Sequence, residues 1–277
     1  MKVADADQSK QRRAIRLVKA HAYGNDFLLT AAEALPKGLD GPAFARAVCD
    51  RHRGIGADGL ITLEGAPDGA RMSLLNADGS YSEVSGNGVR CVAAWLWAQN
   101  PDHERPTLTV HTDAGAKTLR WLSTHGRQIT FVAEMGPPTA MRQVDLPILG
   151  STIRVVVLRV GNPQCVVLGP ATEERLHTIA AALAVDPFFP AGTNVELAEV
   201  VSPDEVRILI WERGVGPTES SGTGACAAAV AAAAFGGANR PVDVVSPGGR
   251  QRVEWTTDGI QLTGWAEVVG EIDWWVD

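Results

Sequence analysis

The sequence has few cysteines, and their arrangement suggests neither a metal site nor a disulfide framework. The four cysteines, Cys49, Cys91, Cys165 and Cys226, are scattered over 277 residues, and no two of them form a CxxC pair. The six histidines also lack ligand spacing. Isolated cysteines of this kind are typical of small buried thiols. We therefore predict four buried free thiols and assign no metal ligand.

The sequence also lacks a long apolar run and an excess of positive charge. No segment approaches the roughly 20 apolar residues that a membrane helix needs, and the polar residues 1–13 lack the apolar core of a signal peptide. The net charge is −7, and the basic residues form no long run. These absences argue against nucleic acid or a membrane as the main partner, and we predict a cytoplasmic protein.

Two short segments half a chain apart are nearly identical. Residues 85–88 read Ser-Gly-Asn-Gly and residues 221–224 read Ser-Gly-Thr-Gly, and an apolar helical stretch follows each. The first N–H groups of a helix have no partner within it, and together with the helix dipole they attract an anion. Two such helix ends that face each other would form one anion-binding cleft with a reactive position on either side.

Other polar residues recur at nearly the same offset. Ser85 and Ser221 lie 136 residues apart, as do Asn76 and Glu212, and Asn25 and Asn162 are 137 apart. A constant offset near half the chain length predicts two related halves. The predicted units are an N-terminal extension at 1–14, domains at 15–137 and 138–264, and a terminal strand at 265–277 that packs on the first domain.

The remaining pattern consists of many short β-rich runs and few helical ones. Helices are expected at 42–50, 88–99, 173–184 and 224–235, and Gly136-Pro137-Pro138 marks the approach to a linker. The short segments between the predicted strands leave little room for crossover helices, and this favours an α+β fold over a doubly wound parallel sheet.

The ordered polar motifs resemble the diaminopimelate epimerase family, whose cofactor-independent enzymes interconvert LL- and meso-diaminopimelate on the route to lysine and peptidoglycan. The resemblance extends from about Val18 to the C-terminus. The matching segments are 24–27, 51–59, 76–80, 86–88, 161–163, 194, 212–214 and 222–226. The resemblance implies two pseudo-symmetric domains of the diaminopimelate epimerase-like fold, each a curved, mostly antiparallel sheet wrapped around a central helix. It also implies a small-molecule substrate, a diaminopimelate-like amino acid, no cofactor, and an assembly compatible with a homodimer.

The chemistry of this family requires two acid/base groups, because the proton leaves one face of the α-carbon and another returns on the opposite face. By resemblance, Ser85 and Ser221 occupy the two catalytic positions, and Gln164 and Glu212 occupy positions that support catalysis. The positions that match substrate-binding residues are Asn25, Asn76, Gly86, Asn87, Asn162, Asn194, Glu212, Arg213, Gly222 and Thr223.

The sequence departs from its family at the two catalytic positions, where the family has cysteines. A free thiol has a pKa of about 8.5 that a helix N-terminus can lower, whereas a serine hydroxyl needs a neighbouring base. Gln164 stands where the family usually has a histidine, and glutamine cannot take up a proton. Pro217 stands where a glutamate is usual.

Three hypotheses follow from these departures. In the first, the protein is an epimerase that uses a serine pair, or a chain in which the cysteines were replaced. In the second, it binds the substrate without catalysis. In the third, it is an isomerase of another substrate and uses a carboxylate base. The candidate carboxylates are Glu83, Glu212 and Glu219.

Overall fold

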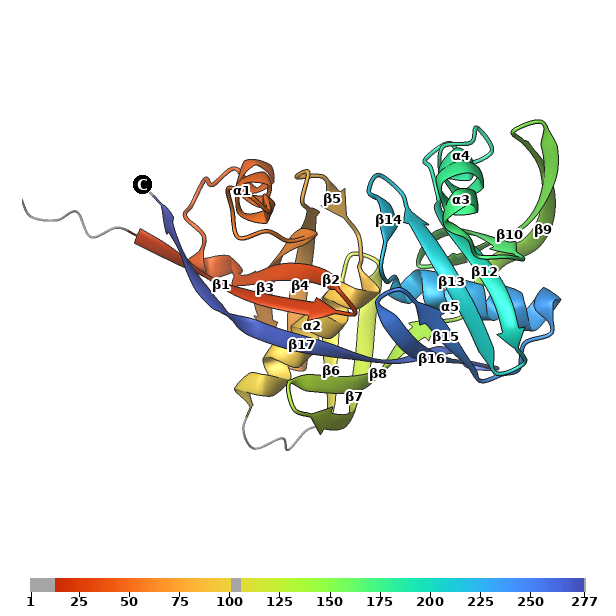
Figure 1. Ribbon diagram of the computed structural model, residues 1–277. Helices are drawn as coiled ribbons and strands as arrows, with labels where there is room; N and C mark the ends of the chain where they lie inside the picture. The colour runs from red at the N-terminus through yellow and green to blue at the C-terminus, as the bar shows by residue number, and fades with distance from the viewer. Residues whose placement is uncertain (1–12, 101–105, 277) are drawn as a thin grey trace, which may run out of the picture.

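The computed structural model describes residues 13–100 and 106–276 (Figure 1). The predicted extension at 1–14 lies almost wholly outside the described residues. In the first half the elements are β1 (Arg13–Ala22), β2 (Asn25–Ala31), a 3-10 turn (Ala32–Ala34), α1 (Gly41–Cys49), β3 (Gly59–Ala66), β4 (Gly69–Asn76), β5 (Tyr81–Ser82), α2 (Gly86–Gln99), β6 (Thr107–Thr112), β7 (Gly115–His125) and β8 (Gln128–Gly136).

The second half repeats this order. Its elements are β9 (Thr139–Ile148), β10 (Ser151–Val160), β11 (Asn162–Leu168), α3 (Glu173–Arg175), a π-helical turn (Leu176–Ala180), α4 (Ala181–Ala184), β12 (Asn194–Ser202), β13 (Glu205–Glu212), β14 (Gly216–Thr218), α5 (Gly222–Ala231), a second π-helical turn (Ala232–Gly236), β15 (Val242–Ser246), β16 (Gly249–Thr256) and β17 (Gly259–Val276).

The strands of the first half close around α2. The pairing order β1, β2, β3, β4, β6, β7, β8 and β17 returns to β1. All of these pairs are antiparallel except β2–β3 and β4–β6. Apolar side chains that alternate along the strands point inward and pack against α2, so the helix forms the centre of the domain.

The second half wraps around α5 in the same way. Parallel pairs occur at the equivalent places, β11–β12 and β13–β15, within an otherwise antiparallel sheet. All ten residues of α5 are buried, as expected for a helix that is apolar on every side. The sequence repeat therefore corresponds to a repeat of the fold, and the expected α+β architecture with a central helix in each curved sheet is confirmed.

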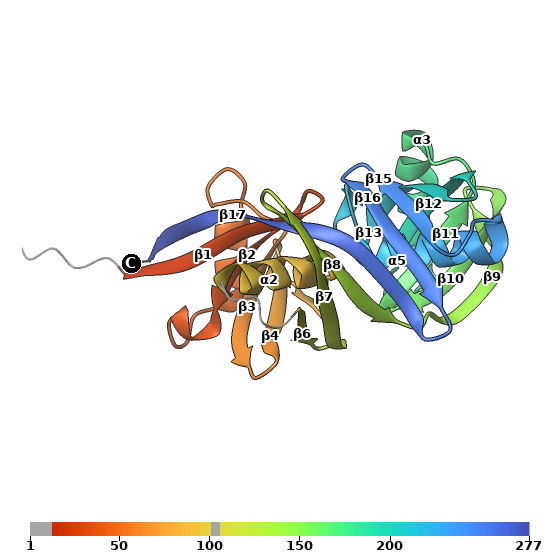
Figure 2. The same cartoon turned by 90° about the horizontal axis from the view of Figure 1, so that it is seen from below.

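The two halves share β17, an 18-residue strand that runs along both (Figure 2). Its first part pairs with β16 and β8, and its last part, from Glu267 to Val276, pairs with β1. No helix among the described residues is long and apolar enough to cross a membrane. The domain boundaries stay predictions.

Some elements are absent from the sequence prediction. The segment after Gly136-Pro137-Pro138, expected to begin a linker, is the strand β9, which pairs with β10. Most of its residues are exposed or half-buried, and only its last part, where Val144, Leu146 and Ile148 alternate with the exposed Asp145 and Pro147, has the pattern of a half-buried strand. The helix expected at 173–184 is broken by a π-helical turn, and β5 and β14 are too short to leave a pattern.

Candidate active site

A cavity of about 410 Å³ lies between the two halves and is lined by residues from both. Every residue predicted by resemblance to catalyse or bind substrate lines this cavity, except Gln164. These lining residues are Asn25, Asn76, Ser85, Gly86, Asn87, Asn162, Asn194, Glu212, Arg213, Ser221, Gly222 and Thr223. Of the three candidate carboxylate bases, Glu83, Glu212 and Glu219, only Glu212 lines the described cavity.

The two serines occupy equivalent positions at the starts of the two central helices. Ser85 is the N-cap of α2, where its Oγ accepts a hydrogen bond from the Gly88 N–H at 3.1 Å. Ser221 is the N-cap of α5, and its Oγ accepts from the Gly224 N–H at the same distance. Serine is favoured at N-caps because its side chain satisfies one of the free N–H groups there. The hydroxyls are thereby fixed at both helix ends.

The two helix ends lie against each other. A Cβ atom added to Gly86 would come within 3.4 Å of the Cα of Gly222, so the small residues allow this close approach. Both helix dipoles and the N–H groups that lack a partner within their helices therefore act on the same part of the cavity. This arrangement favours a negatively charged group of a ligand.

A carboxyl group lies beside Ser221. Burial raises the pKa of Glu212 to about 7, the charge of Asp58 contributes, and the hydroxyls of Thr218 and Ser221 oppose the rise. Glu212 therefore changes its charge near neutral pH, next to a hydroxyl that needs a base. Among the described residues, Ser85 has no hydrogen bond to a carboxylate or a histidine. The two sides of the cavity consequently differ in chemistry although they match in geometry.

A second buried carboxyl, Glu196 on β12, lies behind the start of α5. Its oxygens have no hydrogen-bond partner in the described part of the chain, and one would lie 2.6 Å from a Cβ added to Gly224. Burial and the charge of Glu212 raise the pKa of Glu196 well above its usual value. Burial therefore favours the protonated form of Glu196, and the charge of Glu212 acts in the same direction. Sequence reasoning missed Glu196, because no motif includes it.

Gln164 lies behind the cavity wall. It is buried on β11, and its Nε2 donates to the Oδ1 of Asn162 at 2.6 Å. Asn162 does line the cavity, so Gln164 reaches the site only through this neighbour. Its supporting role in catalysis stays a prediction.

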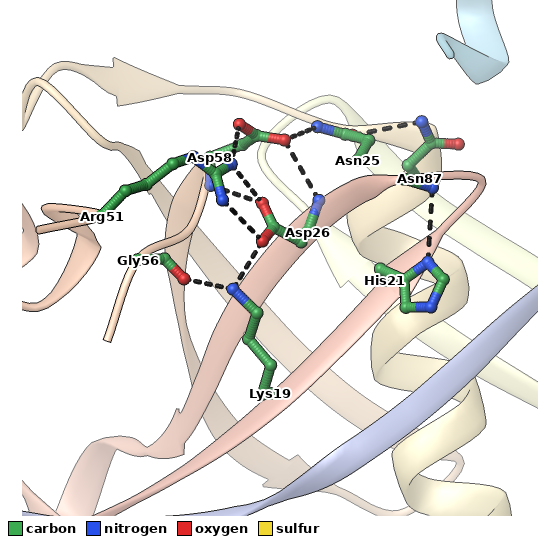
Figure 3. A network of polar contacts seen from close by, with 9 residues as sticks. Lys19, His21, Asn25, Asp26, Arg51, Gly56, Asp58 and Asn87 are labelled. Carbon is green, nitrogen blue, oxygen red and sulfur yellow. Dashed lines mark hydrogen bonds and ion pairs between the residues drawn. The ribbon is translucent and has the colours of Figure 1, made fainter. Parts of the chain in front are cut away.

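A network of charged and amide groups orients Asn25 (Figure 3). The Nδ2 of Asn25 donates to Asp58 at 2.7 Å, and Arg51 donates to the other oxygen of Asp58 at 2.8 Å. Arg51 also donates to both oxygens of Asp26. Because Asn25 Nδ2 is engaged by Asp58, its Oδ1 is left to accept from Asn87 at 3.1 Å. The motif around residues 51–59 therefore positions the amide group of Asn25 and, through it, that of Asn87.

The second half holds Arg213 in a comparable way. The Oδ1 of Asn194 accepts from the backbone N–H of Arg213 at 2.9 Å, and the guanidinium donates to the carbonyl of Ala191 at 3.0 Å. Asn194 and Arg213 both line the cavity. A guanidinium held in this way can donate paired hydrogen bonds to a carboxylate.

Known proteins with the same sequence pattern decide the family. A family model described as diaminopimelate epimerase matches residues 17–141 and 156–269. The chain is 40% identical over 280 residues to a diaminopimelate epimerase of Desulforudis audaxviator, covering 94% of this chain and 99% of that protein. The chain belongs to the diaminopimelate epimerase family. A diaminopimelate epimerase of Desulfitobacterium hafniense is 39% identical over 275 residues, covering 92% of this chain and 96% of that protein.

Solved structures agree with this fold. A hydroxyproline epimerase from Agrobacterium vitis, solved with bound trans-4-hydroxy-L-proline, superposes with a TM-score of 0.69 at 18% identity. The match covers 96% of this chain and 92% of that one. The fold of this chain is therefore shared with a protein of low sequence identity.

Cys91 and Cys226 cannot take the place of the thiols that the resemblance implies at positions 85 and 221. Cys91 and Cys226 are fully buried within the central helices, and burial raises the pKa of both thiols, that of Cys226 to about 12. All four cysteines are free and buried, which confirms the sequence prediction. Acid/base chemistry in the cavity of this family member must therefore use other groups.

Proposed function

We propose that this protein acts as a cofactor-independent amino-acid isomerase of the diaminopimelate epimerase type, on a diaminopimelate-like substrate in lysine biosynthesis. The observation that carries the proposal is the placement of Ser85 and Ser221 at equivalent N-caps on one cavity. This geometry suits an α-carbon that lies between two hydroxyls and is approached from opposite faces. The homodimer suggested by resemblance stays a prediction.

The proposed pose follows from charge. The α-carboxylate lies at the starts of α2 and α5, where the N–H groups of Gly86, Asn87, Gly222 and Thr223 can stabilise it and the charge that builds up when the α-proton leaves. Arg213 and the amide side chains that line the cavity take the remaining carboxylate and ammonium groups.

The proton chemistry is unequal on the two sides. When Glu212 is ionised, it can accept the Ser221 proton as Ser221 Oγ takes the α-proton, or it can take the α-proton directly. Ser85 has no equivalent base among the described residues. We therefore propose slow turnover in which the step on the Ser85 side is limiting. Substrate binding without catalysis is the second candidate function, and the lack of a base beside Ser85 among the described residues favours it.

The test is exchange of the α-proton in D₂O, followed by ¹H NMR separately for LL- and meso-diaminopimelate. We expect deuterium to enter faster than in the uncatalysed reaction, with one stereoisomer exchanging much faster than it epimerises. Binding measured by calorimetry without any exchange would support the second candidate. If the protein shows no binding and no exchange, the substrate assignment is wrong.

A further inference from the structure

Arg90 is a fully buried arginine that lies where the two central helices meet. It belongs to the second turn of α2, and none of its surface is exposed. A guanidinium nitrogen would lie 3.6 Å from a Cβ added to Gly222, and another 2.7 Å from a Cβ added to Gly264. The glycines thus leave room for a cation directly behind the start of α5.

No carboxylate compensates this cation within the described residues. One guanidinium nitrogen donates to the Oδ1 of Asn87, while Nε and the other terminal nitrogen have no hydrogen-bond partner. The titratable groups that act on Arg90 are Tyr23, Cys91 and Cys226. The ring of Tyr23 lies 5.5 Å from the guanidinium, and burial raises the pKa of all three groups. They are therefore neutral at neutral pH.

An arginine does not lose its proton in such a place, so the charge persists. Burying an unpaired charge is unfavourable, and the two helix dipoles that start beside it add further positive potential. An anion that enters the cavity at those helix ends would compensate this charge.

Asn87 couples Arg90 to that place. Its Oδ1 accepts from Arg90, and its Nδ2 donates to Asn25 and to the backbone carbonyl of Ser220, both at 3.1 Å. Ser220 directly precedes the N-cap Ser221. The side chain of Asn87 therefore connects the buried cation with both halves of the cavity wall.

We propose that Arg90 is the buried counter-charge of the site: it strengthens binding of a carboxylate at the two helix starts and favours ionised groups at positions 85 and 221. It acts as a positioning residue, because Asn87 and the backbone separate it from the ligand. The part that concerns the α-carboxylate rests on the proposed function. The part that concerns the local potential does not, and the two can be tested separately.

A thiol placed at the N-cap reports the local potential without any substrate. In S85C and S221C proteins, the rate of alkylation by iodoacetamide against pH gives the pKa of the introduced thiol, and the buried native thiols react little. Adding R90M should slow alkylation at pH 7 about tenfold, whereas R90K, which keeps the charge, should change it less than twofold. Equal rates with R90M and R90K in folded proteins would overturn the proposal.

Folding of each variant is checked by circular dichroism and thermal unfolding. If R90M does not fold, R90Q replaces it, because glutamine is also neutral and can still donate to Asn87. The second measurement compares binding of diaminopimelate with binding of its α-carboxamide, using calorimetry. Neutral variants should lose about tenfold affinity for the carboxylate ligand and little for the amide. An equal loss for both ligands would overturn the role in carboxylate binding while leaving the thiol result intact.

Discussion

Replacing both N-cap serines with cysteine is expected to raise epimerase activity by about 10²–10⁴-fold, the usual contribution of a well-matched acid/base group. A thiol at a helix N-terminus can ionise near neutral pH, whereas a serine hydroxyl cannot. The helix starts, the cavity and the amide groups are already in place around positions 85 and 221. The rate of interconversion of LL- and meso-diaminopimelate by S85C/S221C measures the effect.

A matched control for this double variant is S82C. Ser82 also lines the cavity, but it lies on β5 and caps no helix. The S82C substitution should leave the rate of interconversion within about twofold of the rate of the parent protein. A folded S85C/S221C protein that binds diaminopimelate and gains no activity would show that the thiols alone do not restore the family's chemistry, and the assigned pose would be wrong.

Replacing Glu212 with glutamine is expected to lower α-proton exchange by about 10²-fold or more at pH 8. The pKa of Glu212 is raised to about 7, so its carboxyl is mostly protonated below pH 7 and mostly ionised above it. Only the ionised form can accept a proton. Exchange by the parent protein should therefore increase as the pH rises through about 7 and level off at higher pH, whereas E212Q should lack this increase.

The control for E212Q is E219Q. Glu219 lies close in sequence, but it is not among the residues that line the cavity. We expect E219Q to exchange the α-proton at the same rate, and with the same pH profile, as the parent protein. If E212Q kept the profile and E219Q lost it, the base would be Glu219, one of the carboxylates that the sequence alone left open.

Much of the site could be predicted from the sequence because its parts are local. A serine and two glycines before an apolar run predict a capped helix start, and the repeat of that pattern predicts two of them. The motif around Asn25 and the one around Asn194 also reach the cavity as expected. These features depend on residues that lie close together in the chain.

The rest depends on contacts between distant segments. Arg90 looks like an ordinary helix residue in the sequence. Its burial without a carboxylate partner follows only from the packing of α2 against α5 and Gly264. Glu196 lies within a strand that otherwise reads as buried, and its proximity to Glu212 follows from the register of β12 and β13. The position of Gln164 behind Asn162 rather than in the cavity wall is likewise a result of strand placement.

The pairing of Ser85 and Ser221 across one ligand is tested most directly by a crystal structure of the protein with LL-diaminopimelate bound. We expect the α-carboxylate to lie at the N–H groups that begin α2 and α5, and the α-carbon to lie between the two serine Oγ atoms. A ligand bound with its α-carbon away from either serine, or with an ammonium group at the helix starts, would contradict this pairing.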